Sequence, residues 1–211
     1  MAHIPPVAMT IAGSDSGGGA GIQADLRTFS FHAVHGTSAL TCITAQNTIG
    51  VSRVDALPPE SVVAQIETVI GDIAIQALKT GMLLNQPIIE AVVACVGRLA
   101  GVGCVIDPVM VSRTGAQLID DDAIASLKRL IPLATVLTPN RYEAEILSGR
   151  PIQTLADMQA AARSIHALGA TAVVVKGGGF DGELRGVDVW YDGTASPITL
   201  TTHCIHTTDA H

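Results

Sequence analysis

The chain has 211 residues, of which 48% are hydrophobic and only 3% aromatic, so its core must consist mainly of Ala, Val, Ile and Leu. That composition is typical of fully buried parallel strands. A net charge of −7 argues against a nucleic-acid-binding surface, which would need a basic patch. No hydrophobic run approaches the roughly 18 residues of a membrane span, and the N-terminus lacks the pattern of a secretion signal. We therefore expect a cytoplasmic protein with no membrane or nucleic-acid partner.

Short hydrophobic runs alternate with helical patterns along the chain. Strands are expected at 7–12, 36–45, 51–57, 76–80, 104–107, 135–140, 172–176 and 187–191, and helices at 24–31, 61–73, 85–99, 121–131, 142–148 and 154–168. Asn140 can cap one helix that Gly149 ends, and Thr154 with Asp157 resembles a capping box. This alternation predicts an α/β fold with a doubly wound, mostly parallel sheet and helices on both faces.

We expect one domain over residues 1–211, because no internal repeat or linker divides the chain. Its cysteines are scattered without C-x-x-C spacing, which is typical of reduced, mostly buried thiols. They are Cys42, Cys95, Cys104 and Cys204.

A glycine-rich loop follows the first expected strand, in the run from Ile11 to Asp25. It contains a degenerate dinucleotide fingerprint at residues 19–24, but no acidic residue lies between Asp25 and Asp55 to bind a ribose. Neither Lys79-Thr80 nor Lys176-Gly177 has the glycines of a P-loop before it. Taken alone, the loop is equally well explained as a tight turn.

Several chemically useful side chains directly follow expected strands. In a doubly wound sheet, ligands bind outside the carboxyl ends of the strands. Asp107 and Glu143 could hold Mg²⁺ through water, and Lys176 could neutralise phosphate charge. The bland explanations are a turn at Asp107 and a helix-dipole contact at Glu143, whereas a lysine at the end of a hydrophobic run has little structural reason.

Taken together, these segments resemble the ribokinase-like small-molecule kinases, and within them the hydroxymethylpyrimidine/phosphomethylpyrimidine kinase family. The matching segments occur in family order over essentially the whole chain. They are Thr10-Ile-Ala-Gly-Ser-Asp15, Gly18-Gly-Ala-Gly-Ile-Gln-Ala-Asp-Leu26, Ala45-Gln46-Asn47-Thr48, Lys79-Thr-Gly-Met82, Asp107-Pro-Val-Met110, Thr138-Pro-Asn140 with Glu143, and Lys176-Gly-Gly178.

The resemblance implies a substrate site for an aminopyrimidine that carries a hydroxymethyl group. Gln46 corresponds to the side chain that reads the ring edge, and Met82 to the one that packs on the ring face. Asp25 and the backbone near Gly13 and Ala20 correspond to positions that line the hydroxymethyl pocket. Without the resemblance, Gln46 is better explained as part of a polar turn and Met82 as core packing.

The resemblance also implies ATP and Mg²⁺. Asn140 and Glu143 match an N-x-x-E motif that organises magnesium and phosphate, while Thr138, Asp107 and Lys176 match positions beside the nucleotide phosphates. The implied reaction transfers the γ-phosphoryl of MgATP to the hydroxymethyl group, and a second transfer modifies the monophosphate. The implied assembly is a homodimer.

The catalytic base and the anion hole of the family lie in a glycine run that would begin just after His211. We therefore expect the domain to be truncated at its C-terminus, with no catalytic base within 1–211. Two alternatives stay open. One is a pyridoxal or pyridoxine kinase of the same superfamily, and the other is a pyrimidine-binding protein without phosphoryl transfer.

Overall fold

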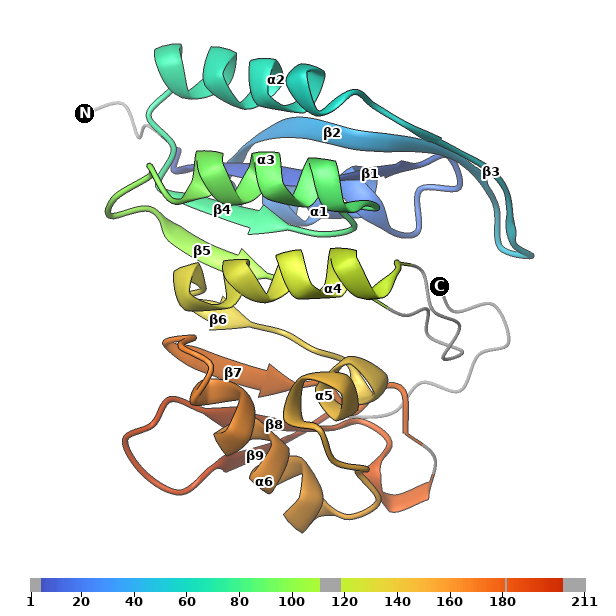
Figure 1. Cartoon of the computed structure of the whole chain (residues 1–211), viewed down its shortest axis with the longest axis vertical. Helices are drawn as coiled ribbons and strands as arrows, with labels where there is room; N and C mark the ends of the chain where they lie inside the picture. The colour runs from blue at the N-terminus through green and yellow to red at the C-terminus, as the bar shows by residue number, and fades with distance from the viewer. Residues whose placement is uncertain (1–4, 111–118, 181, 203–211) are drawn as a thin grey trace.

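The computed structural model describes residues 5–110, 119–180 and 182–202 and contains a central sheet with helices on both sides (Figure 1). The strands are β1 (Val7–Asp15), β2 (His35–Gln46), β3 (Val51–Ala56), β4 (Ala77–Thr80), β5 (Gly103–Ile106), β6 (Val136–Leu137), β7 (Ala172–Val175), β8 (Val187–Tyr191) and β9 (Ile198–Thr201). The α-helices are α1 (Gly21–Phe31), α2 (Pro59–Asp72), α3 (Gln86–Val96), α4 (Asp121–Leu127), α5 (Arg141–Ser148) and α6 (Leu155–His166).

The strand order is β3-β2-β1-β4-β5-β6-β7-β8-β9. β1 pairs in parallel with both β2 and β4, and the parallel pairing continues through β5, β6 and β7. β3, β8 and β9 are antiparallel to their neighbours. The strand order reverses at β1, so the carboxyl ends of β1 and β4 border the crevice where such sheets bind ligands. The predicted doubly wound, mostly parallel α/β fold is confirmed.

The two faces of the sheet carry different helices. α2, α3 and α4 lie side by side over one face, whereas α1 lies on the other (Figure 1). Alternation along β2 explains this difference: Gly36 faces Leu26 and Phe29 of α1, and Ala39 on the opposite face packs in the core with Val62.

The predicted helix ends have the expected local chemistry. Asn85 and Asn140 accept hydrogen bonds from the third residue of α3 and α5 respectively, and α5 has a complete capping box. Gly149 ends α5 with a φ of 69°, a left-handed conformation that glycine adopts without strain. Thr154 and Asp157 form the predicted capping box of α6.

Several elements differ from the sequence prediction. β1 continues to Asp15 and α1 begins at Gly21, so each is three residues longer than predicted. The helix predicted over 121–131 is α-helical only to Leu127 and continues as the 3-10 helix η1 (Lys128–Leu133), because Pro132 cannot donate the hydrogen bond of an α-helix. The strand predicted over 135–140 shortens to Val136–Leu137. β9 was not predicted, since all four of its residues are exposed at a sheet edge and give little hydrophobic signal.

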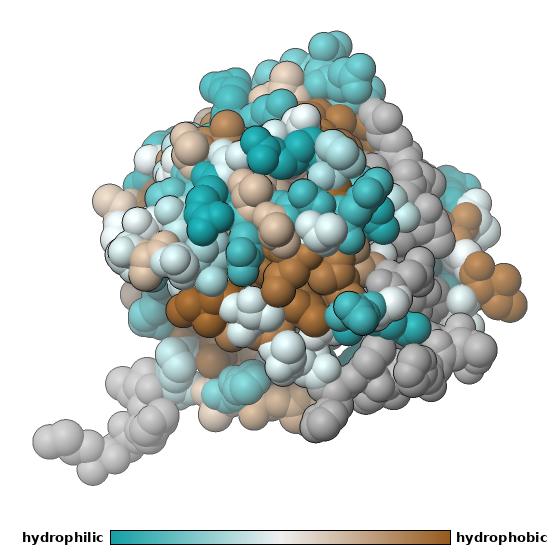
Figure 2. All heavy atoms as spheres, turned by 90° about the horizontal axis from the view of Figure 1, so that it is seen from below, coloured by the Kyte–Doolittle hydropathy of each residue, from teal (hydrophilic) through white to brown (hydrophobic). Residues whose placement is uncertain are grey.

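Figure 2 shows the molecule from the end that Figure 1 draws at the bottom, where hydrophobic side chains interrupt a largely polar surface. In edge strand β9, Ile198 and Leu200 are 55% and 44% exposed. At the opposite edge, every residue of β3 is exposed. The sheet therefore ends in an uncovered strand on each side.

Within the described residues, Cys42, Cys95 and Cys104 are buried free thiols, as predicted, and Cys204 lies outside those residues. Burial raises the pKa of Cys104 to about 12, so this thiol stays protonated and unreactive. None of the described helices has the length and hydrophobicity to cross a membrane.

Candidate functional site at the carboxyl ends of the strands

The glycine loop after β1 is organised by its own carboxylate. Asp15, which is 5% exposed, accepts backbone N–H bonds from Gly17 at 2.8 Å, Gly19 at 3.0 Å and Ala20 at 2.8 Å. The N–H groups that could have cradled a phosphate are therefore occupied by an internal anion. The predicted site residue Ala20 lies in this loop, but its N–H is already bound to Asp15.

Gly21 lets this loop enter α1. Its φ is +58°, and a Cβ atom there would lie 2.4 Å from the carbonyl oxygen of Gly13. Only glycine tolerates both this conformation and this approach. The glycines of this loop thus serve the geometry of the strand-to-helix turn, as the tight-turn interpretation predicts.

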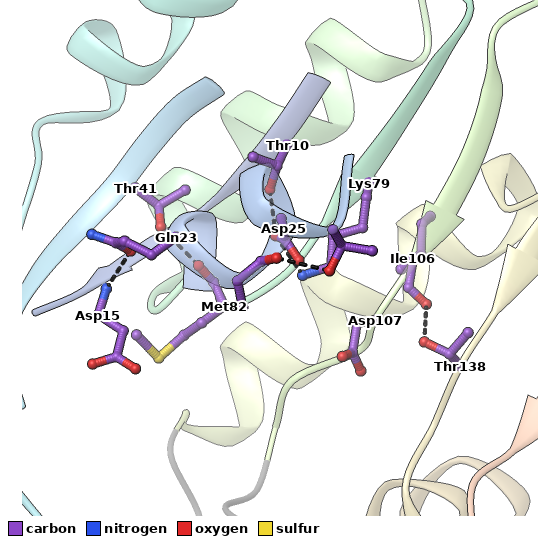
Figure 3. Close-up of polar contacts among 12 residues, drawn as sticks. Thr10, Asp15, Gln23, Asp25, Thr41, Lys79, Met82, Ile106, Asp107 and Thr138 are labelled. Carbon is purple, nitrogen blue, oxygen red and sulfur yellow. Dashed lines mark hydrogen bonds and ion pairs between the residues drawn. The ribbon is translucent and has the colours of Figure 1, made fainter. Parts of the chain in front are cut away.

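Asp25 projects from α1 into a buried polar cluster (Figure 3). Its Oδ2 forms an ion pair with Nζ of Lys79 at 2.9 Å and accepts a hydrogen bond from Oγ1 of Thr10 at 2.6 Å. Lys79 comes from β4 and Thr10 from β1, the two strands beside the reversal of strand order. The side chains are about one-fifth exposed, which leaves the pair in contact with the crevice.

Met82 and Gly13 lie next to each other beside this cluster. A Cβ atom on Gly13 would lie 3.0 Å from Cε of Met82 and 2.6 Å from Sγ of Cys42. The backbone oxygen of Met82 accepts a 2.7 Å hydrogen bond from Oγ1 of Thr41. The absence of a side chain at Gly13 therefore leaves the space in which the thioether lies, and Met82 is half-buried.

The third part of the site joins β5 to β7. Nζ of Lys176 forms an ion pair with Oδ1 of Asp107 at 3.0 Å, and both side chains remain partly exposed. Oγ1 of Thr138 lies between these strands and donates to the carbonyl oxygen of Ile106 at 3.4 Å. Figure 3 shows Asp107 and Thr138 near the same edge of the sheet as Asp25 and Lys79.

Asn140 and Glu143 form the capping box of α5 next to this ion pair. Glu143 is 1% exposed, and its two carboxylate oxygens accept the N–H groups of Asn140 at 2.8 Å and Met110 at 3.2 Å. Burial, and to a lesser extent the charge of Asp107, raise the pKa of Glu143 to about 7 against the lowering effect of its hydrogen bonds and of Lys176. These charge interactions place Glu143, Asp107 and Lys176 in one electrostatic neighbourhood.

The carboxylates near this ion pair show which side chains could hold the expected magnesium ion. No group of three or more His, Cys, Asp and Glu side chains is placed to hold a metal among the residues that the structure describes. Both oxygens of Glu143 already accept backbone N–H groups, so this carboxylate does not suit direct coordination. Asp107 fits better, because only Oδ1 faces Lys176 and Mg²⁺ commonly binds one or two carboxylates and keeps several waters.

Gln46 ends β2 on the other side of the glycine loop. It is half-buried and lines an open cavity of about 490 Å³ together with Ser16, Asn47 and residues of the turn between β2 and β3. Alternation along β2 puts Gln46 on the same face as Cys42, which borders Gly13 and Met82.

The structure thus pairs the predicted Asp25 with Lys79 and the predicted Asp107 with Lys176 near one edge of the sheet, while Gln46 contacts the glycine loop at Ser16. Sequence reasoning missed Lys79 as the partner of Asp25 and Asp15 as the centre of the loop. Both lie within segments that the family resemblance rests on, but sequence spacing does not show which lysine meets which carboxylate. The expected catalytic base lies outside the described residues.

Comparison with known proteins agrees with this geometry. The phosphomethylpyrimidine kinase family model matches residues 15–211. A hydroxymethylpyrimidine/phosphomethylpyrimidine kinase of Synechococcus elongatus is 60% identical over 207 residues, which span 98% of this chain and 78% of that protein.

Solved structures give the same result. The phosphomethylpyrimidine kinase of Clostridium difficile 630 superposes with a TM-score of 0.87 at 42% identity and covers 93% of this chain and 84% of its own. The pyridoxal kinase of Staphylococcus aureus, solved with AMP-PCP, has a TM-score of 0.86 at 34% identity and covers 98% and 75%. The chain, with its ribokinase-like sheet and the paired aspartates and lysines at the carboxyl ends of its strands, belongs to the phosphomethylpyrimidine kinase family.

Proposed function

We propose that the protein transfers the γ-phosphoryl group of ATP to the hydroxymethyl group of 4-amino-5-hydroxymethyl-2-methylpyrimidine, and then phosphorylates the monophosphate, in thiamine diphosphate biosynthesis. The observation that carries this proposal is the pair of Asp–Lys contacts at the carboxyl ends, Asp25–Lys79 and Asp107–Lys176. In this proposal the first pair meets the hydroxyl group of the substrate, and the second supplies charge for the phosphates. The family membership and the names of the relatives support the same reaction.

At the substrate end, Asp25 is suited to accept a hydrogen bond from the hydroxymethyl group, since it is paired with Lys79 and remains partly exposed. Met82 would cover the ring face in the space that Gly13 leaves open. Gln46 offers a carboxamide, which can accept from the ring amino group and donate to a ring nitrogen. The backbone near Ala20 would close this pocket through the shape of the loop.

At the phosphate end, Lys176 would neutralise charge on the transferring phosphoryl group, and Asp107 would hold Mg²⁺ through water. The bound ion supplies neutralisation of the β- and γ-phosphates. Thr138 and Asn140 would lie beside the phosphates, and Glu143 fixes the start of α5 by accepting the N–H of Asn140. These residues position groups rather than react, which is the usual division of work in phosphoryl transfer.

Two variants test this assignment when the kinase activity of the protein, including the glycine run that the family resemblance places after His211, is assayed with the aminopyrimidine, ATP and Mg²⁺. Asp25→Asn should raise KM for the pyrimidine by about tenfold or more and change KM for ATP little, whereas Lys176→Ala should do the reverse. Arg98→Ala is the matched control, because its ion pair with Glu67 lies on the surface. A protein that binds the pyrimidine without forming a phosphorylated product would refute the kinase proposal and favour a non-catalytic binding protein.

Pyridoxal kinase activity is the second candidate, favoured by the match to the Staphylococcus aureus enzyme. Pyridoxal also carries a hydroxymethyl group on a flat nitrogen heterocycle. Comparing kcat/KM for pyridoxal and for the aminopyrimidine on one preparation decides between them, and a larger value for pyridoxal would reverse the proposed order.

We further propose a cytoplasmic homodimer. The buried free thiols of Cys42, Cys95 and Cys104 suit a reducing compartment, and the exposed edge strand β3 leaves surface available for a second copy. Light scattering after gel filtration tests the dimer, and a monomer mass at micromolar concentration would refute it.

A further inference from the structure

The glycine loop is joined to the end of β2 by one serine hydroxyl. Oγ of Ser16 donates to the backbone oxygen of Gln46 at 2.7 Å and accepts from the backbone N–H of the same residue at 2.8 Å. The ladder between β1 and β2 ends at Asp15 and Thr44. The hydroxyl therefore continues the connection past the last pair of the ladder and fixes both polar backbone groups of Gln46.

A second hydroxyl bears on the orientation of the Gln46 carboxamide. Oγ1 of Thr44 donates to the backbone oxygen of Ser14 at 2.8 Å and lies 3.4 Å from the atom assigned as Oε1 of Gln46. The hydroxyl has one proton, and the nearer carbonyl takes it, so Thr44 can only accept from Gln46. This favours the amide orientation with nitrogen toward Thr44 and oxygen free, since the two ends are assigned from their hydrogen bonds.

Close packing reinforces this connection. A Cβ atom on Gly17 would lie 3.2 Å from the backbone oxygen of Gln46 and 3.3 Å from Cα of Asn47. The loop thus lies directly against the start of the turn between β2 and β3, where the open cavity of about 490 Å³ is found. A change at Ser16 acts on Gln46 without passing through Asp25, Lys79 or Met82.

We propose that Ser16 is a positioning residue that holds Gln46 for recognition of an aromatic ring with an amino donor beside a ring-nitrogen acceptor. This inference rests on the proposed function, in which Gln46 reads the aminopyrimidine edge. Holding the backbone in place before the ligand arrives lowers the entropy lost on binding, and the free carboxamide oxygen accepts from the amino group. Ser16 thereby determines specificity while touching no reacting atom.

Calorimetric titration of the full chain with 4-amino-5-hydroxymethyl-2-methylpyrimidine and its 4-oxo analogue tests the proposal. Ser16→Ala should weaken binding of the amino compound by about threefold to tenfold, the range of one or two hydrogen bonds, and should narrow its preference over the 4-oxo ring. Ser16→Thr keeps the hydroxyl and should restore both.

Ser52→Ala is the matched control, because that hydroxyl lines the same cavity but bonds within the hairpin, to the oxygen of Ala45 at 3.0 Å. Unchanged affinity in Ser16→Ala, or an equal loss in Ser52→Ala, would overturn the positioning role. Failure of the unmutated chain to bind the pyrimidine would overturn the proposed function, and with it the recognition role of Gln46.

Amide hydrogen exchange separates these two failures, because it needs no ligand. The Gln46 N–H should exchange about threefold to tenfold faster in Ser16→Ala than in the unmutated chain. Faster exchange without any pyrimidine binding would mean that Ser16 holds Gln46 but that the substrate is wrong. Equal exchange in both proteins would overturn the proposal by itself.

Discussion

The two glycine runs of this chain differ in what their backbone faces. In the run after β1, the carboxylate of Asp15 accepts the N–H groups of Gly17, Gly19 and Ala20. In the run after β7, only the N–H of Gly177 bonds to a carboxylate, that of Asp188 at 2.7 Å, and Cβ atoms on Gly178 and Gly179 would meet nothing within 4 Å. The glycine run after β1 is thus a closed turn, whereas the run after β7 leaves open space next to Gly178 and Gly179.

The charged residue that precedes each glycine run explains this difference. Asp15 is the last residue of β1 and folds back over the loop that follows, whereas Lys176, the first residue after β7, places a cation that faces Asp107 across the sheet. The first run shapes a pocket wall and the second leaves space beside a positive charge. Glycine content alone predicts neither outcome.

The largest effect is expected from Gly177→Ala. A Cβ atom there would lie 1.9 Å from the backbone oxygen of Val187, so β7 and β8 would have to move apart. We expect a loss of roughly 3 kcal/mol or more in the free energy of unfolding. Gly178→Ala is the paired control and should change it by less than about 0.5 kcal/mol. Equal urea midpoints for the two variants would contradict the distinction between tight and open positions in this run.

Glu143, beside the second run, predicts a pH dependence of stability. Its folded pKa of about 7 lies above the ordinary 4.5, so the stability that its protonated form provides is complete below pH 4.5 and is lost as the pH rises through 7. The loss is on the order of 3 kcal/mol. Urea unfolding of metal-free protein between pH 5 and 8 measures it.

The matched variants for this pH dependence are Glu143→Gln, which should remove it, and Glu67→Gln at an exposed position, which should keep it. A decline of stability in Glu143→Gln as steep as in the unmutated protein would show that another group titrates.

Removing the carboxylate of Asp15 should lower the free energy of unfolding by less than the two changes above. Asp15→Ala leaves three N–H groups without their acceptor, and water can reach part of this exposed loop. We expect about 2 kcal/mol of lost stability. If Asp15→Ala also gained affinity for inorganic phosphate, the carboxylate would be shown to keep an anion site closed. If the variant were as stable as the unmutated protein, the role of Asp15 in the loop would be contradicted.

The smallest of the four effects is expected from Gly13→Ala, and it should appear in binding as well as in stability, because the new Cβ atom would lie 2.6 Å from Sγ of the buried Cys42. Gly13→Ala would press on the Cε of Met82 at 3.0 Å, which belongs to a flexible side chain, and on Sγ of Cys42. We expect KM for the pyrimidine to rise by about tenfold with kcat/KM falling accordingly. A second change, Met82→Leu, shortens the side chain and should recover part of the loss. An unchanged KM in Gly13→Ala would show that Met82 does not line the ring pocket.

Much of the fold could be predicted because its signals are local. Hydrophobic runs of 4–8 residues, caps at Asn140 and Thr154 and a stop at Gly149 depend on neighbours along the chain, and the structure confirms them. The prediction failed at two places. Pro132 converts the end of one helix into a 3-10 helix, and β9 is a strand only because it pairs with β8.

The sequence by itself determined the α/β architecture, the family and the set of polar residues at the strand ends, since alternation and motif order are properties of the chain. Only the tertiary structure decided the partners: Lys79 with Asp25, Lys176 with Asp107, Asp15 with its own loop and Ser16 with Gln46. These contacts join residues up to 69 positions apart or depend on how a loop folds back. They exist because parallel strands bring their carboxyl ends to one edge, where side chains of opposite charge and unpaired backbone groups meet.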